Sequence, residues 1–259
     1  ETYLVTSSKS LNKFDISSFG NYLSEILGER MAGLIHTTND DVADREKLDK
    51  GSTRLITGNS TIKETINGLN FEISMQSFFQ TNPKSAEKLY TKVIDYALEN
   101  KEAIDNTVVM DLFCGTGTIG QILASRSTNA KIIGVDIVAS AIEDAIKNAE
   151  RNNIDGLQFY TADVGKFLAE HPEYKNKIRT IILDPARAGI APKTLLKIIN
   201  INADRIVYVS CNPATQARDT EEMRNNGYQI KKISLVDQFP HTSHIETVVL
   251  FEKISIDTI

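Results

Sequence analysis

From about Thr107 onward, the chain alternates short apolar runs with amphipathic stretches. Five of these runs are rich in β-branched residues and have the length of buried strands. They are Thr107–Phe113, Lys131–Ile137, Leu157–Ala162, Arg179–Leu183 and Arg205–Ser210. Helical periodicity follows at Ser140–Asn152, Lys193–Ile201 and Ala214–Asn226. Strands that alternate with helices predict an α/β fold, in which helices cover both faces of a parallel sheet.

Two more apolar runs end this region, at Gln229–Val236 and Ile245–Phe251. The loop between them, Asp237–His244, is too short for a crossover helix, so we expect the two strands to pair antiparallel. Five parallel strands closed by such a hairpin form the class I (Rossmann-like) sheet of S-adenosylmethionine-dependent methyltransferases, rather than that of a dinucleotide dehydrogenase.

The first hundred residues have a different pattern, which predicts a smaller α+β segment. Two strands are expected around a helix, and three short β segments with glycine-containing turns follow them. A proline then opens a long helix with one apolar stripe, at Leu89, Val93 and Ala97. These elements are, in order, Tyr3–Thr6, Asp15–Leu27, Met31–Thr37, Arg54–Thr57, Thr61–Thr65, Phe71–Met75 and Pro83–Glu99, and Thr38–Lys50 is expected to be an exposed loop. We predict an N-terminal segment over residues 1–76 and a catalytic domain over residues 77–259.

Composition and charge narrow the function classes. The chain is 41% hydrophobic and 24% charged, as in ordinary globular proteins, and no apolar run approaches the roughly 20 residues that span a bilayer. The presence of only two cysteines argues against a disulfide framework and favours a reducing, cytoplasmic compartment. It also excludes a four-cysteine metal or iron–sulfur site built by this chain alone, and we expect no metal. The net charge of −5 does not favour nucleic-acid binding.

A glycine-rich turn follows the first strand of the predicted sheet. Gly115 and Gly117 let the backbone approach a ligand closely, and Asp136, at the end of the next strand, is placed to accept hydrogen bonds from ribose hydroxyls. The same spacing fits a dinucleotide fingerprint, and alone it is a weak signal. The acidic Asp111 before the glycines and the terminal hairpin favour S-adenosylmethionine over NAD. Cys114, within this turn, is interpreted as a packing residue, and Asp163 either caps a helix or lies near the adenine.

The predicted reacting centre lies at the ends of the last two parallel strands. One strand ends at Asp184, and the other ends at Cys211, so both side chains should face one crevice. Carbon 5 of uracil is too weak a nucleophile for direct methylation, but thiolate addition to C6 converts the base into a reactive enolate. Ala186 and Arg187 stand where amino-group methyltransferases usually have the residues that hold a planar amine, so methylation of a base nitrogen is disfavoured. The loop also lacks the cysteine that cytosine-C5 enzymes typically carry there, so cytosine is disfavoured as the substrate. A buried structural cysteine is the alternative reading of Cys211.

Carbon methylation by this route also needs a base that removes the C5 proton. Glu246 opens a hydrophobic strand, where desolvation can raise the pKa of a carboxyl group. An ordinary strand-edge glutamate is the alternative, and His241 or His244 could serve instead or simply brace the loop.

Together these motifs resemble the RNA uracil-C5 methyltransferase family, which makes 5-methyluridine in ribosomal and transfer RNA. The resemblance covers almost the whole chain through five ordered motifs. They are Ser77–Pro83, Asp111–Gly120, Asp184–Gly189, Ser210–Asp219 and Phe239–Glu246.

Position by position, the resemblance implies that Cys211 is the nucleophile and Glu246 the base. It further implies a cofactor pocket that includes Gln80, Phe113, Gly115, Gly117, Thr118, Asp136, Asp163 and Asp184. Thr118 stands where many members have asparagine, so that contact is altered or lost. Phe78 or Phe79 could stack on a flipped uracil, and a core position is an equal alternative for one of them.

The implied function is S-adenosylmethionine-dependent methylation of a specific uridine in structured RNA, either 23S rRNA or tRNA, by a cytoplasmic monomer. Many members also carry an OB-like RNA-binding domain and some an iron–sulfur site, and this sequence has neither. We expect either that the chain was cut before Glu1 or that the enzyme docks RNA with a reduced surface, and the acidic net charge favours the cut chain. The alternatives are a methyltransferase of another substrate class, a catalytically silent RNA-binding homologue, and an NAD-dependent enzyme.

Overall fold

The computed structural model describes residues 2–9, 14–40, 52–74, 77–98, 107–127 and 129–254. It divides into two compact units, which are Glu1–Glu64 with Glu72–Ser77, and Thr65–Phe71 with Phe78–Ile259. Whether the protein has independently folding domains that meet after residue 76 stays a prediction. Within the described residues, no helix is both long and apolar enough to cross a membrane.

The smaller unit contains a three-stranded sheet and one long helix. Strand β1 (Thr2–Thr6) pairs parallel with β2 (Gly33–Thr38), and β3 (Ser52–Gly58) pairs antiparallel with β2. Helix α1 (Ile16–Leu27) connects β1 to β2, and the carboxylate of Asp15 caps it. The strand predicted to start at Met31 begins at Gly33, because a 3₁₀ turn (η2, Gly28–Arg30) first ends the helix. Of the predicted loop, residues 41–50 lie outside the described part of the chain.

A β-hairpin follows, formed by β4 (Thr61–Ile66) and β5 (Leu69–Ser74). Its turn residues, Asn67 and Gly68, both have positive φ angles, 50° and 83°. That conformation matches the twist of a two-residue hairpin and explains the Asn-Gly sequence. The predicted strand extended to Met75, which lies outside the described residues.

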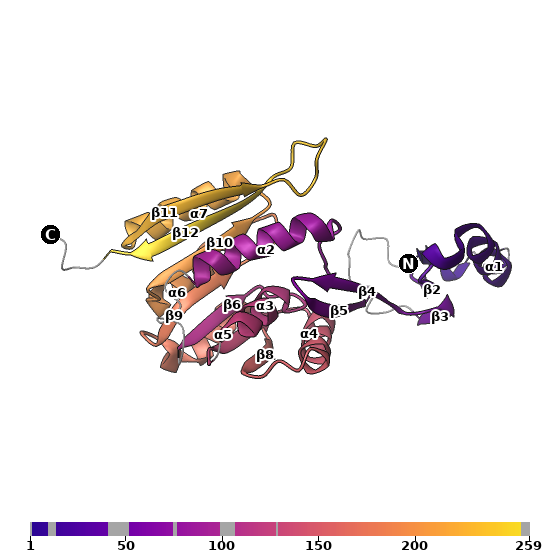
Figure 1. Cartoon of the computed structure of the whole chain (residues 1–259), viewed down its shortest axis with the longest axis horizontal. Coiled ribbons are helices and arrows are strands. Elements are labelled where there is room, and N and C mark those ends of the chain that lie inside the picture. The colour runs from indigo at the N-terminus through magenta and orange to yellow at the C-terminus, as the bar shows by residue number, and fades with distance from the viewer. Residues whose placement is uncertain are drawn as a thin grey trace. The chain divides into compact units, whose positions relative to one another are not determined.

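The larger unit is built on a seven-stranded sheet in the order β11-β12-β10-β9-β6-β7-β8. The five strands from β10 to β8 are parallel, and β12 pairs antiparallel with both β10 and β11. The strands are β6 (Val108–Leu112), β7 (Lys131–Asp136), β8 (Leu157–Thr161), β9 (Ile178–Leu183), β10 (Arg205–Ser210), β11 (Tyr228–Val236) and β12 (Glu246–Lys253). This sheet confirms the predicted fold class. Figure 1 shows the loop between β11 and β12 extending beyond the end of the sheet.

Helices cover both faces of this sheet. One face carries α2 (Pro83–Ala97), α3 (Thr118–Arg126) and α4 (Ala139–Arg151). The other carries α5 (Val164–Glu170), α6 (Pro192–Ile201) and α7 (Pro213–Asn225), with a short 3₁₀ turn, η4 (Pro172–Tyr174), after α5. The core lies between these layers, where β-branched strand residues meet apolar helix faces.

Helix α2 runs antiparallel to β10, which decides what its side chains face. Near its start, Asn82 and Ser85 donate hydrogen bonds to the carbonyl groups of Gln238 and Asp237. Near its end, Arg205 at the beginning of β10 donates to the carbonyl groups of the last helical turn. The start of α2 therefore lies at the carboxyl ends of the parallel strands. Its predicted apolar stripe is fully buried, and Glu99 lies outside the described residues.

Candidate active site

The glycine turn between β6 and α3 has the backbone conformation that its sequence predicts. Gly115 and Gly117 have φ angles of 52° and 67°, and Gly117 is the left-handed residue immediately before α3. A Cβ on Gly117 would stand only 2.6 Å from the ring of Phe159. Phe113 also has a positive φ of 63°, while its N–H donates to the carbonyl of Val135. A strained non-glycine residue at a ligand-binding turn is typical of functional sites.

Asp136 ties this turn to the neighbouring strand. One of its carboxylate oxygens accepts from the N–H of Gly115 at 2.9 Å, and the other accepts from Val138 at 2.8 Å. Each oxygen has a second lone pair, so ribose hydroxyls can still bind there. The structure thus places Asp136 where the sequence predicts it, with a role in shaping the turn that the sequence did not indicate.

Asp111 is fully buried below the glycines. Its Oδ2 accepts from the N–H of Gly120 at 2.9 Å, whereas Oδ1 has no hydrogen-bond partner among the described residues. Burial, opposed by that hydrogen bond, raises the pKa of Asp111 to about 7. A buried oxygen without a partner is costly, and a cationic or hydrogen-bond-donating ligand would relieve that cost.

Three other residues of the predicted cofactor region, Thr118, Asp163 and Cys114, have contacts that point less directly to a cofactor. Thr118 is buried, and its hydroxyl lies 3.1 Å from that of Thr116. Asp163 is exposed and caps α5 by accepting a hydrogen bond from the N–H of Lys166. Of the two roles expected for Asp163, the structure thus contains the helix cap, and a contact with the cofactor stays a prediction. Burial and the charges of Asp111 and Asp136 raise the pKa of the Cys114 thiol well above its usual range, as expected for a packing residue.

Cys211 lies in the turn between β10 and α7. Asn212 caps the helix by accepting from Ala214, and Pro213 occupies its first position. Because the proline cannot extend the strand and the asparagine starts the helix, the chain turns sharply at the thiol. Ser210 bridges this turn through hydrogen bonds to both the N–H and the carbonyl of Asn212.

Hydrogen bonds also fix the turn to the loop after β9. The side chains of Asn212 and Thr215 both donate to the carbonyl of Arg187, at 3.1 and 3.4 Å. Deeper in the unit, Asp219 accepts from the Tyr208 hydroxyl at 2.7 Å and from the N–H of Ile190 at 3.0 Å. Hydrogen bonds thus join the loop that carries Asp184 to the turn that carries Cys211 and to α7.

Glu246 is the first residue of β12, between β10 and β11. Because Ser210 pairs with Thr247 across the β10–β12 ladder, Cys211 and Glu246 occupy the next position at its end. Glu246 is only 6% exposed, and burial raises the pKa of its carboxyl group. Because β12 lies between two other strands, Glu246 is not the exposed glutamate of an edge strand that the sequence left as the alternative.

The charges at this edge of the sheet act on one another. Burial, the charge of Glu246 and that of Asp111 raise the pKa of Asp184 to about 7. Burial and then the charges of Glu246 and Asp184 raise the pKa of the Cys211 thiol, while Arg187 lowers it. The structure therefore brings together the three side chains predicted from separate motifs. His241 and His244 are exposed in the loop before β12.

Gln80 is buried next to the start of α2, whereas Phe78 is 74% exposed. Phe79 is half-buried and packs on Phe71 with ring centroids 5.9 Å apart. Of the two phenylalanines, Phe78 has the free ring that a stacking contact needs, and Phe79 takes the core position.

Sequence reasoning missed Tyr90, a buried residue of α2 whose pKa is raised by burial and by the charges of Asp184, Glu246 and Asp111. It also missed Gln216, which accepts from Thr247 at 2.6 Å and donates to the carbonyl of Tyr208. These residues act across long sequence separations, so only the register of the fold could have indicated them.

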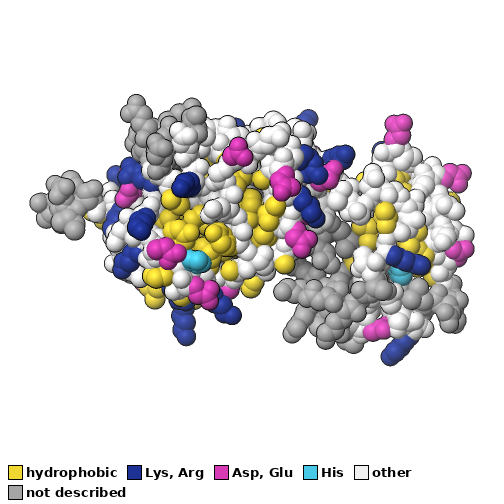
Figure 2. All heavy atoms as spheres, turned by 90° about the horizontal axis from the view of Figure 1, so that it is seen from below, with side chains coloured by type: hydrophobic (Ala, Val, Ile, Leu, Met, Phe, Trp, Pro, Cys, Tyr) yellow, Lys and Arg dark blue, Asp and Glu magenta, His cyan; other side chains and the backbone are white. Residues whose placement is uncertain are grey.

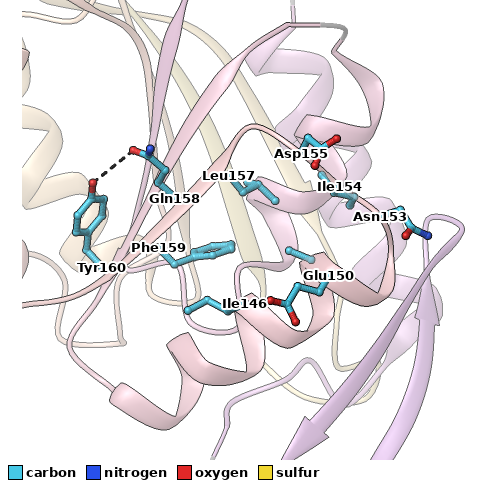
Figure 3. A pocket seen from close by; sticks show the side chains of 10 residues that line it. Ile146, Glu150, Asn153, Ile154, Asp155, Leu157, Gln158, Phe159 and Tyr160 are labelled. Atoms are coloured by element: carbon cyan, nitrogen blue, oxygen red, sulfur yellow. Dashed lines mark hydrogen bonds between the residues drawn. The ribbon is translucent and has the colours of Figure 1, made fainter.

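A separate hollow of about 770 Å³ lies between α4 and the edge strand β8, and none of the predicted site residues lines it. Figure 3 shows Ile146 and Phe159 pointing toward each other in it, while Gln158 and Tyr160 lie on the opposite side of the strand. Phe159 separates this hollow from the glycine turn.

Within the described residues, no cluster of three or more histidine, cysteine, aspartate or glutamate side chains could hold a metal ion. In Figure 2, lysine and arginine side chains are scattered over the visible face of the larger unit, with acidic side chains between them. The charges on this face therefore do not indicate where RNA would bind.

Known proteins resemble the chain over nearly its whole length. An uncharacterized RNA methyltransferase of Clostridium acetobutylicum is 44% identical over 252 residues, which are 96% of this chain and 52% of that protein. A second, from Caldanaerobacter subterraneus, is 38% identical over 96% of this chain and 53% of its own length. The chain thus spans about half the length of these curated relatives.

Among solved structures, a tRNA (uracil-54, C5)-methyltransferase of Pyrococcus abyssi in complex with S-adenosyl-L-homocysteine has a TM-score of 0.69 and 31% identity. The match covers 95% of this chain and 55% of that one. The profile of the tRNA (uracil-5-)-methyltransferase family matches residues 51–254. With its sheet, its glycine turn and its strand-end cysteine, the chain belongs to the tRNA (uracil-5-)-methyltransferase family, as its sequence motifs predicted.

Proposed function

We propose that this chain is the catalytic part of an S-adenosylmethionine-dependent RNA methyltransferase that adds a methyl group to C5 of a uridine. The main support is the adjacency of Cys211 and Glu246 at the end of the β10–β12 ladder, with Asp184 beside them. A nucleophile and a base in one crevice are what carbon methylation requires. Methylation of a heteroatom needs no covalent activation by a thiolate, which argues against another substrate class.

Several observations support a fit to S-adenosylmethionine. The cofactor carries positive charge, and Asp111 offers a buried oxygen without a partner among the described residues. In the turn that follows, Gly115 has open space where a side chain would stand. The related enzyme from Pyrococcus abyssi was solved with the demethylated form of the cofactor. Gln80, Phe113, Asp136 and Asp184 would hold the cofactor in this chain. When bound, it would supply an electrophilic methyl group.

Cys211 would start the reaction on the base. Its thiolate forms a bond to C6 of uracil, the electrons of the C5–C6 double bond move toward C4, and O4 becomes negatively charged. C5 is then nucleophilic enough to take a methyl group. Since burial and then acidic neighbours raise the pKa of Cys211 in the free protein, positive charge from the cofactor and from Arg187 would favour the thiolate.

Glu246 would complete the reaction. After C5 carries the methyl group, its remaining proton must leave, and the electrons of the broken C–H bond restore the C5–C6 double bond and expel the thiolate. A buried carboxylate with a raised pKa holds that proton better than an exposed one. Glu246 is favoured over His241 and His244 because it is buried beside the thiol.

We further propose that the substrate is structured RNA, either tRNA or 23S rRNA, and that the protein acts as a monomer in the cytoplasm. The family description and the Pyrococcus abyssi relative refer to tRNA uracil. Mapping 5-methyluridine in total RNA, with and without the gene, would distinguish the two RNAs.

The decisive experiment uses RNA that contains 5-fluorouridine. Because fluorine cannot leave as a proton, the enzyme should stay covalently attached to the methylated base. Cys211→Ala should abolish both the adduct and methyl transfer, while calorimetry with S-adenosylmethionine gives nearly the parent affinity. Cys114→Ser serves as the matched control and should form the adduct. Retained turnover in Cys211→Ala, or an adduct through Cys114, would refute the proposal.

A further inference from the structure

Tyr90 lies in the second turn of α2, on the face that packs against the sheet. Side chains on a helix tilt toward its N-terminus. Since α2 starts at the carboxyl ends of the parallel strands, the Tyr90 ring leans toward the edge of the sheet that carries Asp184 and Glu246.

The surroundings of Tyr90 agree with this direction. The residue is only 5% exposed, and no described residue is hydrogen-bonded to its hydroxyl. Burial and, in decreasing order, the charges of Asp184, Glu246 and Asp111 raise the pKa of Tyr90, so the phenol remains a neutral O–H donor. The hydroxyl oxygen is not one of the fully buried side-chain atoms that lack a partner among the described residues, so it keeps enough exposure for water or a ligand to accept its hydrogen bond.

The reaction proposed above creates such an acceptor. When the thiolate of Cys211 adds to C6, negative charge develops on O4 of the uracil. Asp111, Asp184 and Glu246 repel that charge when they are ionised, so the crevice needs a neutral donor aimed at it.

We propose that the Tyr90 hydroxyl donates a hydrogen bond to O4 of the uracil and stabilises the enolate that forms when Cys211 adds to the base. This inference rests on the proposed function, and it makes Tyr90 a catalytic residue that acts before methyl transfer. Tyr90 gives up no proton: the charge on O4 returns to the ring when C5 is methylated.

The test compares Tyr90→Phe with Tyr96→Phe. Both residues are buried tyrosines of α2, but the Tyr96 hydroxyl lies 2.6 Å from that of Ser234, on β11. Each variant keeps its ring and therefore its packing. With 5-fluorouridine RNA and saturating cofactor, Tyr90→Phe should form the covalent adduct roughly 10²-fold more slowly than the parent, as for loss of one oxyanion donor. Tyr96→Phe should form it at nearly the parent rate.

Two more measurements separate the roles that Tyr90 could have. Calorimetry should give Tyr90→Phe the parent affinity for S-adenosylmethionine, and a large loss of affinity would make Tyr90 a cofactor contact and overturn the inference. With ordinary RNA, an accumulating methylated adduct would place Tyr90 at the proton-removal step and also overturn it. A parent enzyme that forms no adduct refutes the proposed function itself, whereas parent and Tyr90→Phe enzymes with equal rates refute only the role of Tyr90.

Discussion

Cys211 and Glu246 occupy neighbouring positions at the end of the antiparallel β10–β12 ladder, directly beyond the pair Ser210 and Thr247. One comes from the last of the parallel strands, and the other comes from the strand inserted between it and β11. The hairpin that ends the sheet thus has a chemical consequence, because it places a buried carboxylate beside a thiol. Burial and the charge of Glu246 make the thiol harder to ionise, whereas the raised pKa of Glu246 itself comes from burial.

That relationship predicts the reactivity of Cys211. Because burial, Glu246 and Asp184 all raise the pKa of the thiol, Glu246→Gln should lower it and increase the thiolate fraction at neutral pH. In a Cys114→Ser background, iodoacetamide should alkylate Cys211 several-fold faster at pH 7.5 after this change. Mass spectrometry over a pH series would measure the rates.

Glu252→Gln is the matched control, since Glu252 lies toward the other end of β12 and pairs with Arg205. It should leave the alkylation rate unchanged. Equal rates in the parent and in Glu246→Gln would show that the carboxylate does not act on the thiol.

The buried carboxylates also predict how stability depends on pH. The pKa of Asp184 is about 7 in the folded protein, above the ordinary value of 3.8. The protonated form is therefore favoured by folding, and this contribution is complete below about pH 4 and is lost as the pH rises through about 7. Asp184→Asn stays neutral, so it should raise the free energy of unfolding at pH 8 by about 1–3 kcal/mol relative to the parent.

Urea denaturation at pH 5 and pH 8 would check this prediction. The advantage of Asp184→Asn should shrink at pH 5, where the parent aspartate is mostly protonated. An exposed carboxylate, Asp155, provides the control for a general charge effect, because Asp155→Asn should give the same small change at both pH values. If the two variants behave alike, the raised pKa of Asp184 is wrong.

The two glycines of the turn between β6 and α3, Gly115 and Gly117, should differ in their tolerance of a methyl group. Both have positive φ angles, so alanine costs about 1–2 kcal/mol at either position. A Cβ on Gly115 meets no atom within 4 Å, but one on Gly117 overlaps the Phe159 ring at 2.6 Å. Gly117→Ala should therefore be clearly less stable than Gly115→Ala in cofactor-free urea denaturation. Adding Phe159→Leu should recover part of that difference, and a double variant no better than the sum of its parts would contradict the overlap.

Much of the larger unit could be predicted because its strands are short, β-branched and separated by periodic helices. All five parallel strands lie within one or two residues of their predicted ranges. The order of the last two strands was harder to predict from the sequence. The short loop predicted that β11 and β12 pair with each other, but the position of β12 beside β10 depends on contacts between residues far apart in the sequence.

The positions of the candidate site residues were predictable where a residue type and a strand end coincide, as at Asp184 and Cys211. Tyr90 gave no such signal, because a tyrosine beside Leu89 in an amphipathic helix is an ordinary core residue until the direction of the helix is known. The bond from Tyr208 to Asp219 was equally hidden, since it depends on how α7 packs on the sheet. Asp163 differs from these residues, because its role as a helix cap could be predicted from the local sequence, and the structure contains the hydrogen bond from the N–H of Lys166 that such a cap requires.

Glu246→Gln separates the two chemical steps that other changes merge. If Glu246 is the base, Cys211 can still add to the uridine and C5 can still be methylated, but the C5 proton remains in place. Glutamine keeps the size of the side chain and cannot accept the proton, so release of product should slow by roughly 10²–10⁴-fold. With unmodified RNA and methyl-labelled cofactor, a denaturing gel should show a labelled band that contains both protein and RNA. Adding Cys211→Ala must remove that band, because no adduct forms without the thiol. Free methylated RNA released at the parent rate would exclude Glu246, and His241→Ala and His244→Ala would then test the nearest other bases of the loop.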